Sequence, residues 1–592
     1  MSAPALAGTG EVIKVSGPVI EVTGLPAARL FDIVRVGRER LLGEVIRLDG
    51  PRATVQVFED TTGLGVGEPV ADTGAPLTVE LGPGLLGSIV DGIQRPLPVL
   101  YESGGLFIPR GSDPPRLDRD RRWAFTPAVR AGATVAAGDL LGTVAETTAL
   151  EHRILVPPGH GGRVETIASG ELRVTDPLAR VGDRELTMVQ HWPVRTARPV
   201  RRRLPLTGPL LTGQRVLDTL FPVALGGAAI IPGGFGTGKT VLEQAVAKFS
   251  AADIVVYIGC GERGNELTEV LQEFPELTDP RTGAPLMERT GLVANTSNMP
   301  VAARESSVYV GITIAEYFRD QGYHVALLAD STSRWGEALR EVSSRLEEIP
   351  AEDGYPAYLA TRLAGFYERS GAVSFLGSPE RTGSVTIVGA VSPAGGDFSE
   401  PVTQNSLRMA GCFWALDTGL ARQRHFPSIN WTRSYTGYLL DDWFDQQVAA
   451  DWSALRGWAM EVLQEEGSLA EIVALLGIDA IAPGQRVTLR LGRLLREDFL
   501  QQSSFDETDA SCPPAKQVAM LRVIRRAGEA MTAAVRRGVP PADVVEVPEL
   551  ARLGTMKRWP TDGVAARASQ LAGELATIVD RLRGADESEE QP

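Results

Sequence analysis

The stretch from Gly233 to Thr240 constrains this chain more than any other part of it. It reads Gly-Gly-Phe-Gly-Thr-Gly-Lys-Thr, which is the pattern G-x-x-x-x-G-K-T. The apolar residues 228–231 precede it, and a helical pattern follows from Val241. A glycine loop between a strand and a helix N-terminus turns backbone N–H groups and a partial positive charge toward one anion. The stretch therefore predicts a site for the phosphates of a nucleoside triphosphate.

The residues of this loop receive predicted roles from the chemistry of phosphate binding. Lys239 is expected to reach the β- and γ-phosphates, and the Thr240 hydroxyl is expected to bind Mg²⁺. A chance glycine-rich turn is the alternative, but it does not explain the strand, lysine, hydroxyl and helix together. The other predicted nucleotide contacts are Gly233, Gly234, Phe235, Gly236, Thr237, Gly238 and Val241.

Length and composition limit what the chain around this loop can be. Its 592 residues suggest about three to five domains at ~100–200 residues each. The net charge of −15 argues against a motor that tracks nucleic acid, which would need a basic channel. Cys260, Cys412 and Cys512 lie far apart, so we expect neither a disulfide framework nor a zinc site. No apolar run reaches the ~18 residues of a membrane span, and we expect no transmembrane segment.

Two β-rich regions are predicted before the loop. Alternating runs broken by glycine over residues 1–78 indicate a small antiparallel barrel. An oligonucleotide-binding barrel is the alternative, but stacking aromatic residues and excess basic charge are missing, which favours a structural role. The insert at 110–190 has the glycine-punctuated strands of biotinyl and lipoyl carriers but no lysine to hold such a group. We predict a stalk or packing module.

The rest of the chain is predicted to contain an α/β core and a helical domain. Residues 79–109 and 191–435 form a P-loop domain in which alternating strands and helices indicate a mostly parallel sheet. Its connector 193–209, rich in proline and arginine, is expected to pack on an acidic surface, with a phosphate or RNA contact as the alternative. Residues 436–583 are predicted to be helical, and 584–592 to be a disordered acidic tail. The predicted strands are 228–231, 253–258, 291–295, 324–329 and 384–391; the predicted helices are 240–249, 265–274, 301–320, 332–346, 439–465, 469–476, 487–500, 516–537 and 563–583.

Two acidic residues follow predicted strands, at the sheet edge where ligands of such folds bind. Glu262 lies on a turn flanked by glycine and is expected to orient a water that attacks the γ-phosphate, with adjacent Arg263 assisting; a helix cap is the alternative. Asp330 ends an apolar strand and is expected to bind Mg²⁺ through water. Capping of the next helix is its alternative. Arg334 is a candidate phosphate or interface contact, or else a surface ion pair.

These stretches together resemble the catalytic A subunit of V/A-type rotary ATPases. The resemblance extends over nearly the whole chain, and the start of the insert, at 102–111, resembles the "bulge" that separates this subunit from the shorter F-type beta subunit. Its most specific motifs are 233–240, 259–266, 329–335 and 422–431.

The resemblance implies an assembly, a reaction and further site residues. It implies a hexamer of alternating A and B subunits, central and peripheral stalks, and ATP hydrolysis or synthesis coupled to H⁺ or Na⁺ passage through a separate membrane sector. ATP or ADP with Mg²⁺ would bind, with Glu262 as the water-activating base, Arg263 as a switch or phosphate partner, and Phe426 and Phe505 flanking adenine. The B subunit would supply an arginine finger. The chain would lie peripherally on the cytoplasmic face of the membrane, without nucleic acid as a partner.

Two departures and three alternatives accompany this resemblance. Gly234 stands where many relatives have proline, which should loosen the turn. Thr237 stands where eukaryotic relatives have cysteine, so a disulfide with Cys512 cannot form. An export-type ATPase should lack the insert, and an RNA translocase conflicts with the acidic charge. A nucleotide sensor without catalysis usually lacks the lysine or the glutamate, and this chain has both, as Lys239 and Glu262.

Overall fold

The computed structural model describes residues 8–105, 108–265, 272 and 274–582. The predicted tail at 584–592, Glu266 and most of the predicted helix 265–274 lie outside these residues. The chain forms two compact units. The first comprises Met1–Leu206, Leu225–Ile230 and Ala252–Ala410, and the second comprises Thr207–Ala224, Ile231–Ala251 and Gly411–Pro592.

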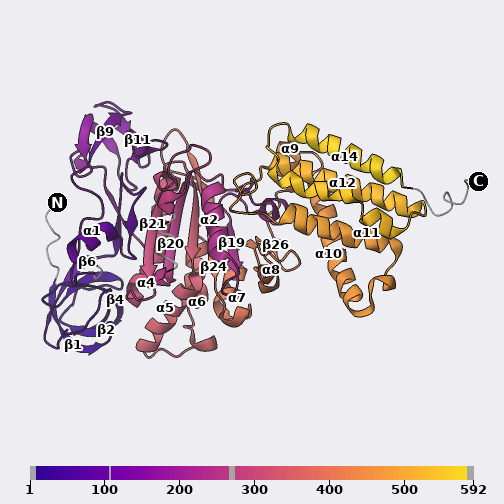
Figure 1. Cartoon of the computed structure of the whole chain (residues 1–592). Helices are drawn as coiled ribbons and strands as arrows, with labels where there is room; N and C mark the ends of the chain where they lie inside the picture. The colour runs from indigo at the N-terminus through magenta and orange to yellow at the C-terminus, as the bar shows by residue number, and fades with distance from the viewer. Residues whose placement is uncertain (1–7, 106–107, 266–271, 273, 583–592) are drawn as a thin grey trace, which may run out of the picture. The chain divides into compact units, whose positions relative to one another are not determined.

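The first unit begins with a closed antiparallel barrel, at the indigo end of Figure 1. Alternate residues point inward, and valines such as Val12, Val34 and Val55 are fully buried in its core. The predicted barrel is confirmed. Its strands, in the order in which they pair, are β1 (Gly8–Ser16), β2 (Val19–Thr23), β5 (Arg52–Val57), β4 (Leu41–Asp49), β3 (Asp32–Val36) and β6 (Pro69–Pro76).

The insert consists of two four-stranded sheets. Buried Glu146 fixes it to the rest of the unit, because its carboxylate accepts hydrogen bonds from the backbone N–H groups of Gly84 and Leu86. Glu146 also pairs with His152, whose Nε2 lies 2.8 Å from the hydroxyl of Tyr317. The first sheet contains β10 (Thr134–Val135), β13 (Gly162–Ile167), β15 (Ala179–Val181) and β16 (Arg184–Leu186); the second contains β12 (Glu151–Leu155), β11 (Leu140–Ala145), β9 (Arg122–Pro127) and β14 (Gly170–Arg173).

The core of the first unit is a parallel sheet with strands in the order β24 (Thr382–Val391), β22 (His324–Asp330), β20 (Ile254–Glu262), β21 (Thr290–Thr296) and β8 (Ile89–Val90). Their almost continuous burial is typical of parallel strands covered on both faces. Helices α4 (Val301–Asp320) and α5 (Thr332–Arg345) pack against it. The unit also contains β7 (Thr78–Leu81), β17 (Gln190–Pro193), β18 (Arg202–Leu204), β23 (Gly371–Ser374), α1 (Leu97–Gly104), α6 (Leu359–Tyr367) and α7 (Pro401–Met409).

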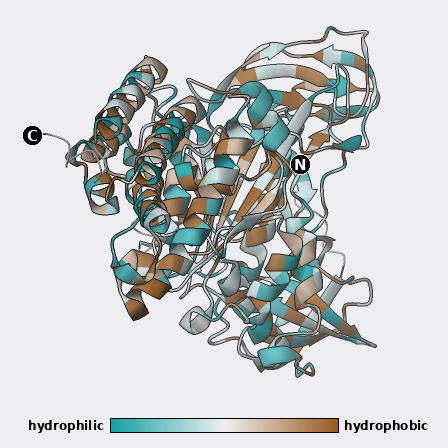
Figure 2. Ribbon diagram, turned by 90° about the vertical axis from the view of Figure 1, so that its right-hand side faces the viewer, coloured by the Kyte–Doolittle hydropathy of each residue, from teal (hydrophilic) through white to brown (hydrophobic). Residues whose placement is uncertain are grey.

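The second unit is mainly helical and is coloured orange and yellow over most of its length in Figure 1. In Figure 2 the helices that lead to the C-terminus carry both brown and teal residues, as expected for helices with one buried face. Strand β19 (Ala228–Pro232) passes from the first unit into the second at Ile231. The other elements are α2 (Lys239–Phe249), β25 (Cys412–Phe413), α8 (Thr418–Arg422), β26 (Tyr435–Thr436), α9 (Asp441–Gln447), α10 (Trp452–Leu476), α11 (Pro483–Leu494), α12 (Pro514–Arg536), α13 (Pro541–Val545) and α14 (Val564–Asp580).

Some predicted helix boundaries in this unit were wrong. The predicted helix 439–465 is divided between α9 and α10, whereas the predicted break before Leu469 does not exist. Gly467 costs about 1 kcal/mol in a helix interior. Leu463 and Leu469 are buried on either side of it, and this packing outweighs the local preference. Among the described residues, no helix is both long enough and apolar enough to cross a bilayer.

The arginine-rich connector packs on acidic groups of the first unit, as predicted. Arg195 donates to both carboxylate oxygens of Glu44 in the barrel, at 3.2 and 2.8 Å, and to those of Glu305 in α4, at 3.0 and 2.7 Å. Arg198 pairs with fully buried Asp320 at 2.5 Å. One guanidinium therefore joins the barrel to the helix that covers the sheet.

Replacing Arg195 with leucine should lower the free energy of unfolding of the first unit by about 3 kcal/mol, because two buried carboxylates would lose their shared partner. Urea denaturation of the full chain measures this. The matched control is Arg202→Leu, whose ion pair with Glu380 is exposed and should contribute nothing measurable. Equal effects of the two substitutions would contradict the bridging role of Arg195.

Candidate functional site

The glycine loop of the second unit adopts a conformation that side chains would obstruct. Gly236 and Gly238 have φ angles of +74° and +87°, in the left-handed region that favours glycine. A Cβ on Gly233 would lie 2.7 Å from the Thr237 hydroxyl oxygen and 2.8 Å from the side chain of Leu416. These positions explain the glycines of the motif. Gly234 has open space for a Cβ, with its nearest neighbour at 3.7 Å.

The loop ends where α2 begins, and its lysine turns back over it. Gly238 occupies the N-cap position of α2 and offers no capping side chain. The ammonium group of Lys239 donates to the carbonyl of Gly233 at 3.0 Å. Thr237 is buried and its hydroxyl donates to the carbonyl of Gly234, while Phe235 is 80% exposed. A helix N-terminus with a glycine cap and a nearby ammonium group is suited to an anion.

A cavity of about 680 Å³ lies in the same unit, close to this helix start. Val241, Phe426 and Phe505 all line it, so the structure brings these predicted residues together. The Phe426 ring lies 3.3 Å from the point where a Cβ on Gly238 would be, so it packs directly on the loop. Phe505 is 93% exposed, which leaves its face available to a flat ligand.

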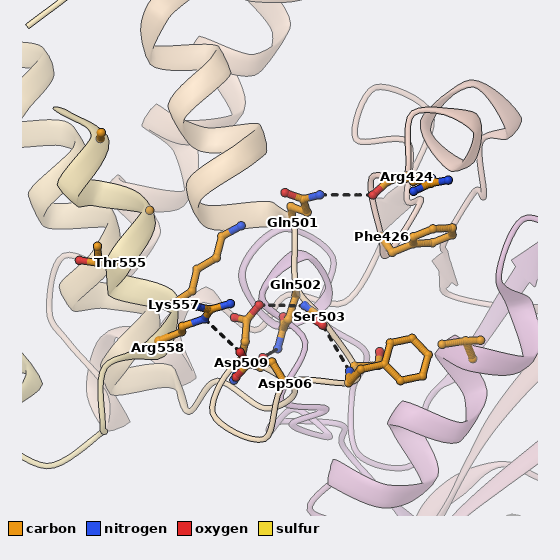
Figure 3. A pocket seen from close by; sticks show the side chains of 15 residues that line it. Arg424, Phe426, Gln501, Gln502, Ser503, Asp506, Asp509, Thr555, Lys557 and Arg558 are labelled. Atoms are coloured by element: carbon orange, nitrogen blue, oxygen red, sulfur yellow. Dashed lines mark hydrogen bonds and ion pairs between the residues drawn. The ribbon is translucent and has the colours of Figure 1, made fainter. Parts of the chain in front are cut away.

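Charged and polar groups line the rest of the cavity. Figure 3 shows Thr555, Lys557 and Arg558 on one side of it and Arg424 and Phe426 on the other. Arg558 donates to Asp506 at 3.1 Å. Burial lowers the pKa of the Lys557 ammonium group, and its charge is further disfavoured by Arg215. The cavity therefore combines aromatic surfaces with a basic rim.

In the first unit, Glu262 ends β20 on a tightly packed turn. Gly261 has φ +71°, and a Cβ there would meet the side chains of Arg304 and Arg334 at 2.8 and 2.9 Å. Arg304 donates to the carbonyl of Ser297 at 2.8 Å. The turn that leads to half-buried Glu262 thus packs against two arginines, whereas Arg263 is exposed.

Asp330 ends the neighbouring strand β22 and is buried. The hydroxyl of Tyr257 donates to its carboxylate at 3.4 Å. Helix α5 has Ser331, not Asp330, at its N-cap. Arg334 pairs with Glu337 at 2.9 Å. The register pairs Asp330 with Gly259, so the ends of β20 and β22 lie side by side in this unit.

Four models of known protein families match successive parts of the chain. The models are the ATP synthase alpha/beta family beta-barrel domain at 12–74, the barrel-sandwich domain at 114–195, the nucleotide-binding domain at 213–436 and the C-terminal domain of V and A type ATP synthase at 441–540. The chain is 60% identical over 552 residues to the A-type ATP synthase A subunit 2 of Methanospirillum hungatei, covering 93% of this chain and 94% of the relative.

The chain belongs to the family of A-type ATP synthase A subunits and V-type ATP synthase alpha chains. It is 56% identical to the A-type family member of Methanopyrus kandleri, covering 97% of this chain and 98% of the relative. It is also 56% identical to the V-type ATP synthase alpha chain of Thermoanaerobacter pseudethanolicus, covering 93% and 94%. The predicted family and the predicted fold class are confirmed. The interpretation of this chain as the catalytic chain of an ATP synthase is also confirmed and is favoured over the export-type alternative.

A solved structure of a type III secretion ATPase shares the fold. The ATPase EscN of the enteropathogenic E. coli type III secretion system matches with a TM-score of 0.63 at 21% identity, covering 87% of this chain and 99% of that one. At this identity the likeness concerns the fold alone.

Some residues of this family member's site were missed from the sequence. Arg304 received no predicted role from the sequence, although it packs against the turn of Glu262. Gln501, Lys557 and Arg558 line the cavity, but they belong to stretches without a recognisable sequence pattern. Arg424 lies within the motif 422–431, so a search for residues beside Phe426 could have found it.

Replacing Phe505 with alanine should weaken ATP binding about 5- to 150-fold, because stacking on a base contributes ~1–3 kcal/mol. Isothermal titration calorimetry of the full chain measures this. The melting temperature should stay unchanged, since the ring is 93% exposed. Leu475→Ala, at an exposed apolar position of α10, is the control and should alter neither quantity. Unchanged ATP affinity in the Phe505 variant would contradict the assignment.

Proposed function

We propose that this chain binds ATP at the 233–240 loop and catalyses its reversible hydrolysis within an ATP synthase. The observation that carries the proposal is the glycine-capped start of α2, with the Lys239 ammonium group turned over the loop and an aromatic cavity beside it. The loop backbone would hold the phosphates, Lys239 would offset the charge on the β- and γ-phosphates, and Phe426 and Phe505 would flank the base.

Mg²⁺ fits the oxygen donors offered by the candidate residues. The Thr240 hydroxyl would bind it directly and the Asp330 carboxylate through water, since hydroxyl and carboxylate oxygens are ligands that Mg²⁺ prefers. When bound, Mg²⁺ neutralises charge on the β- and γ-phosphate oxygens. Glu262 would orient and deprotonate the water that attacks the γ-phosphate, and Arg263 would contact a phosphate or respond to its loss.

We further propose the assembly around this site. The B subunit would alternate with this chain in a hexamer and supply an arginine finger, and central and peripheral stalks would couple turnover to H⁺ or Na⁺ passage at a membrane. The chain would lie peripherally on its cytoplasmic face. The proposed domains are the barrel at 1–78, the β-rich insert at 110–190, the P-loop domain at 79–109 and 191–435, the helical domain at 436–583 and the acidic tail at 584–592.

Replacing Glu262 with glutamine should lower ATP turnover of the assembled A–B complex ~10²–10⁴-fold, because the amide cannot accept the proton of water. ATP affinity should remain within about twofold, since the phosphates are held by the loop. A coupled assay measures turnover and calorimetry measures affinity.

Glu380→Gln is the matched control, because Glu380 lies in an exposed pair with Arg202. It should leave turnover and affinity unchanged. Multiple turnovers at the wild-type rate by the Glu262 variant would remove this residue from the proposed chemistry.

A further inference from the structure

Arg215 is fully buried in the second unit, and the proposed chemistry leaves it without a task. It precedes a π-helical turn, Val216–Leu220, and its guanidinium points toward the segment that leads to Phe505. Its Nη2 donates to the carbonyl of Gln501 at 2.8 Å, its Nε donates to the carbonyl of Phe499, and its Nη1 lies 2.7 Å from the carboxylate of Asp509. One side chain therefore holds both ends of the loop 501–509.

Gln502 provides a second connection between the same segments. Its side-chain oxygen accepts the backbone N–H of Arg215 at 2.8 Å, and its amide nitrogen donates to the carbonyls of Gly213 and Asp509 at 2.9 and 2.8 Å. The backbone N–H of Gln502 donates to the carbonyl of Phe426 at 2.8 Å. These bonds occupy the amide of Gln502, although this residue lines the cavity.

The connections control where the aromatic residues of the cavity stand. Phe505 lies at the exposed tip of the loop 501–509, whose backbone is fixed by Arg215, Gln502 and Asp509. The N–H of Ser503, two residues before Phe505, donates to the Asp509 carboxylate at 2.8 Å. Phe426 is tied to the same loop through Gln502. The separation between the rings of Phe426 and Phe505 thus depends on the buried polar cluster that Arg215, Gln502 and Asp509 form.

We propose that Arg215 is a positioning residue that sets the geometry of the base-binding cavity, acting through Gln502 and Asp509. This inference rests on the proposed binding of ATP at the 233–240 loop. It assigns the part of the ATP affinity that comes from the base to the polar cluster of Arg215, Gln502 and Asp509. The part of the ATP affinity that comes from the phosphates remains with the 233–240 loop. Loss of the cluster should therefore weaken ligands that carry a base and spare ligands that consist of phosphates alone.

An arginine is required here because its planar guanidinium can contact several acceptors at once. Lysine carries the same charge and can still pair with Asp509, but a single ammonium group cannot also reach the carbonyls of Phe499 and Gln501 in the same geometry. The substitution Arg215→Lys thus avoids leaving Asp509 without a buried partner, which would be strongly destabilising.

Calorimetric titration of the full chain with ATP and with inorganic tripolyphosphate tests the proposal. Arg215→Lys should raise the dissociation constant of ATP about tenfold, as expected for the loss of charge-assisted hydrogen bonds, and should change that of tripolyphosphate less than about twofold. Asp509→Asn keeps an acceptor for Ser503 while removing the charge, and it should shift the ratio of the two constants in the same direction. This second variant decides the matter if the first does not fold.

Arg198→Lys is the matched control. Arg198 is also deeply buried and pairs with Asp320, but it belongs to the first unit. It should lower thermal stability without changing the ratio of the two dissociation constants, so the ratio separates positioning from a general loss of structure. Equal weakening of ATP and tripolyphosphate by Arg215→Lys and Asp509→Asn, or no weakening of ATP, would overturn the inference. A wild-type chain that binds neither ligand would overturn the proposed function as well.

Discussion

The start of α2 combines three elements that each favour an anion at the same place. A helix N-terminus exposes a partial positive charge, a glycine cap keeps side chains away from it, and an ammonium group one residue later adds a full charge. The positive φ angles of Gly236 and Gly238 make this geometry possible. An ordinary side chain would be strained at either position, so these two positions require glycine. The rest of the site has to be arranged around this constraint on the loop.

The second unit shows how a distant part of the chain completes this loop. Phe426 packs on Gly238, and the loop 501–509 is anchored by Arg215, which lies before the glycine motif in sequence. Hydrogen bonds therefore join residues 213–215, 424–426, 496–510 and 557 within this unit. Burial raises the pKa of Asp218 in this region to about 6, against hydrogen bonds from Thr212, Gly213 and Gln517. The helical domain is thus part of the candidate site as well as its neighbour in sequence.

The sequence was informative where chemistry requires a particular residue at a particular spacing. The glycine loop, the strands with continuous apolar burial and the alternating barrel strands all have such patterns, and the fold class followed from them. Gln502 shows the limit of this approach, because its role depends on Arg215, and a contact across hundreds of residues leaves no local pattern. The break predicted between residues 465 and 469 shows a second limit: Gly467 is locally unfavourable in a helix, but tertiary packing keeps α10 continuous.

The central claim is that this chain holds one half of a catalytic site and needs a second protein for turnover. It is tested most directly by purifying the chain alone and after co-expression with its candidate B partner, and by measuring ATP binding and steady-state hydrolysis of both. We predict that the chain alone binds ATP, and that the A–B complex hydrolyses it ~10³–10⁵ times faster, because in our proposal the B partner supplies the arginine finger. Equal turnover by the isolated chain and the complex would contradict the claim.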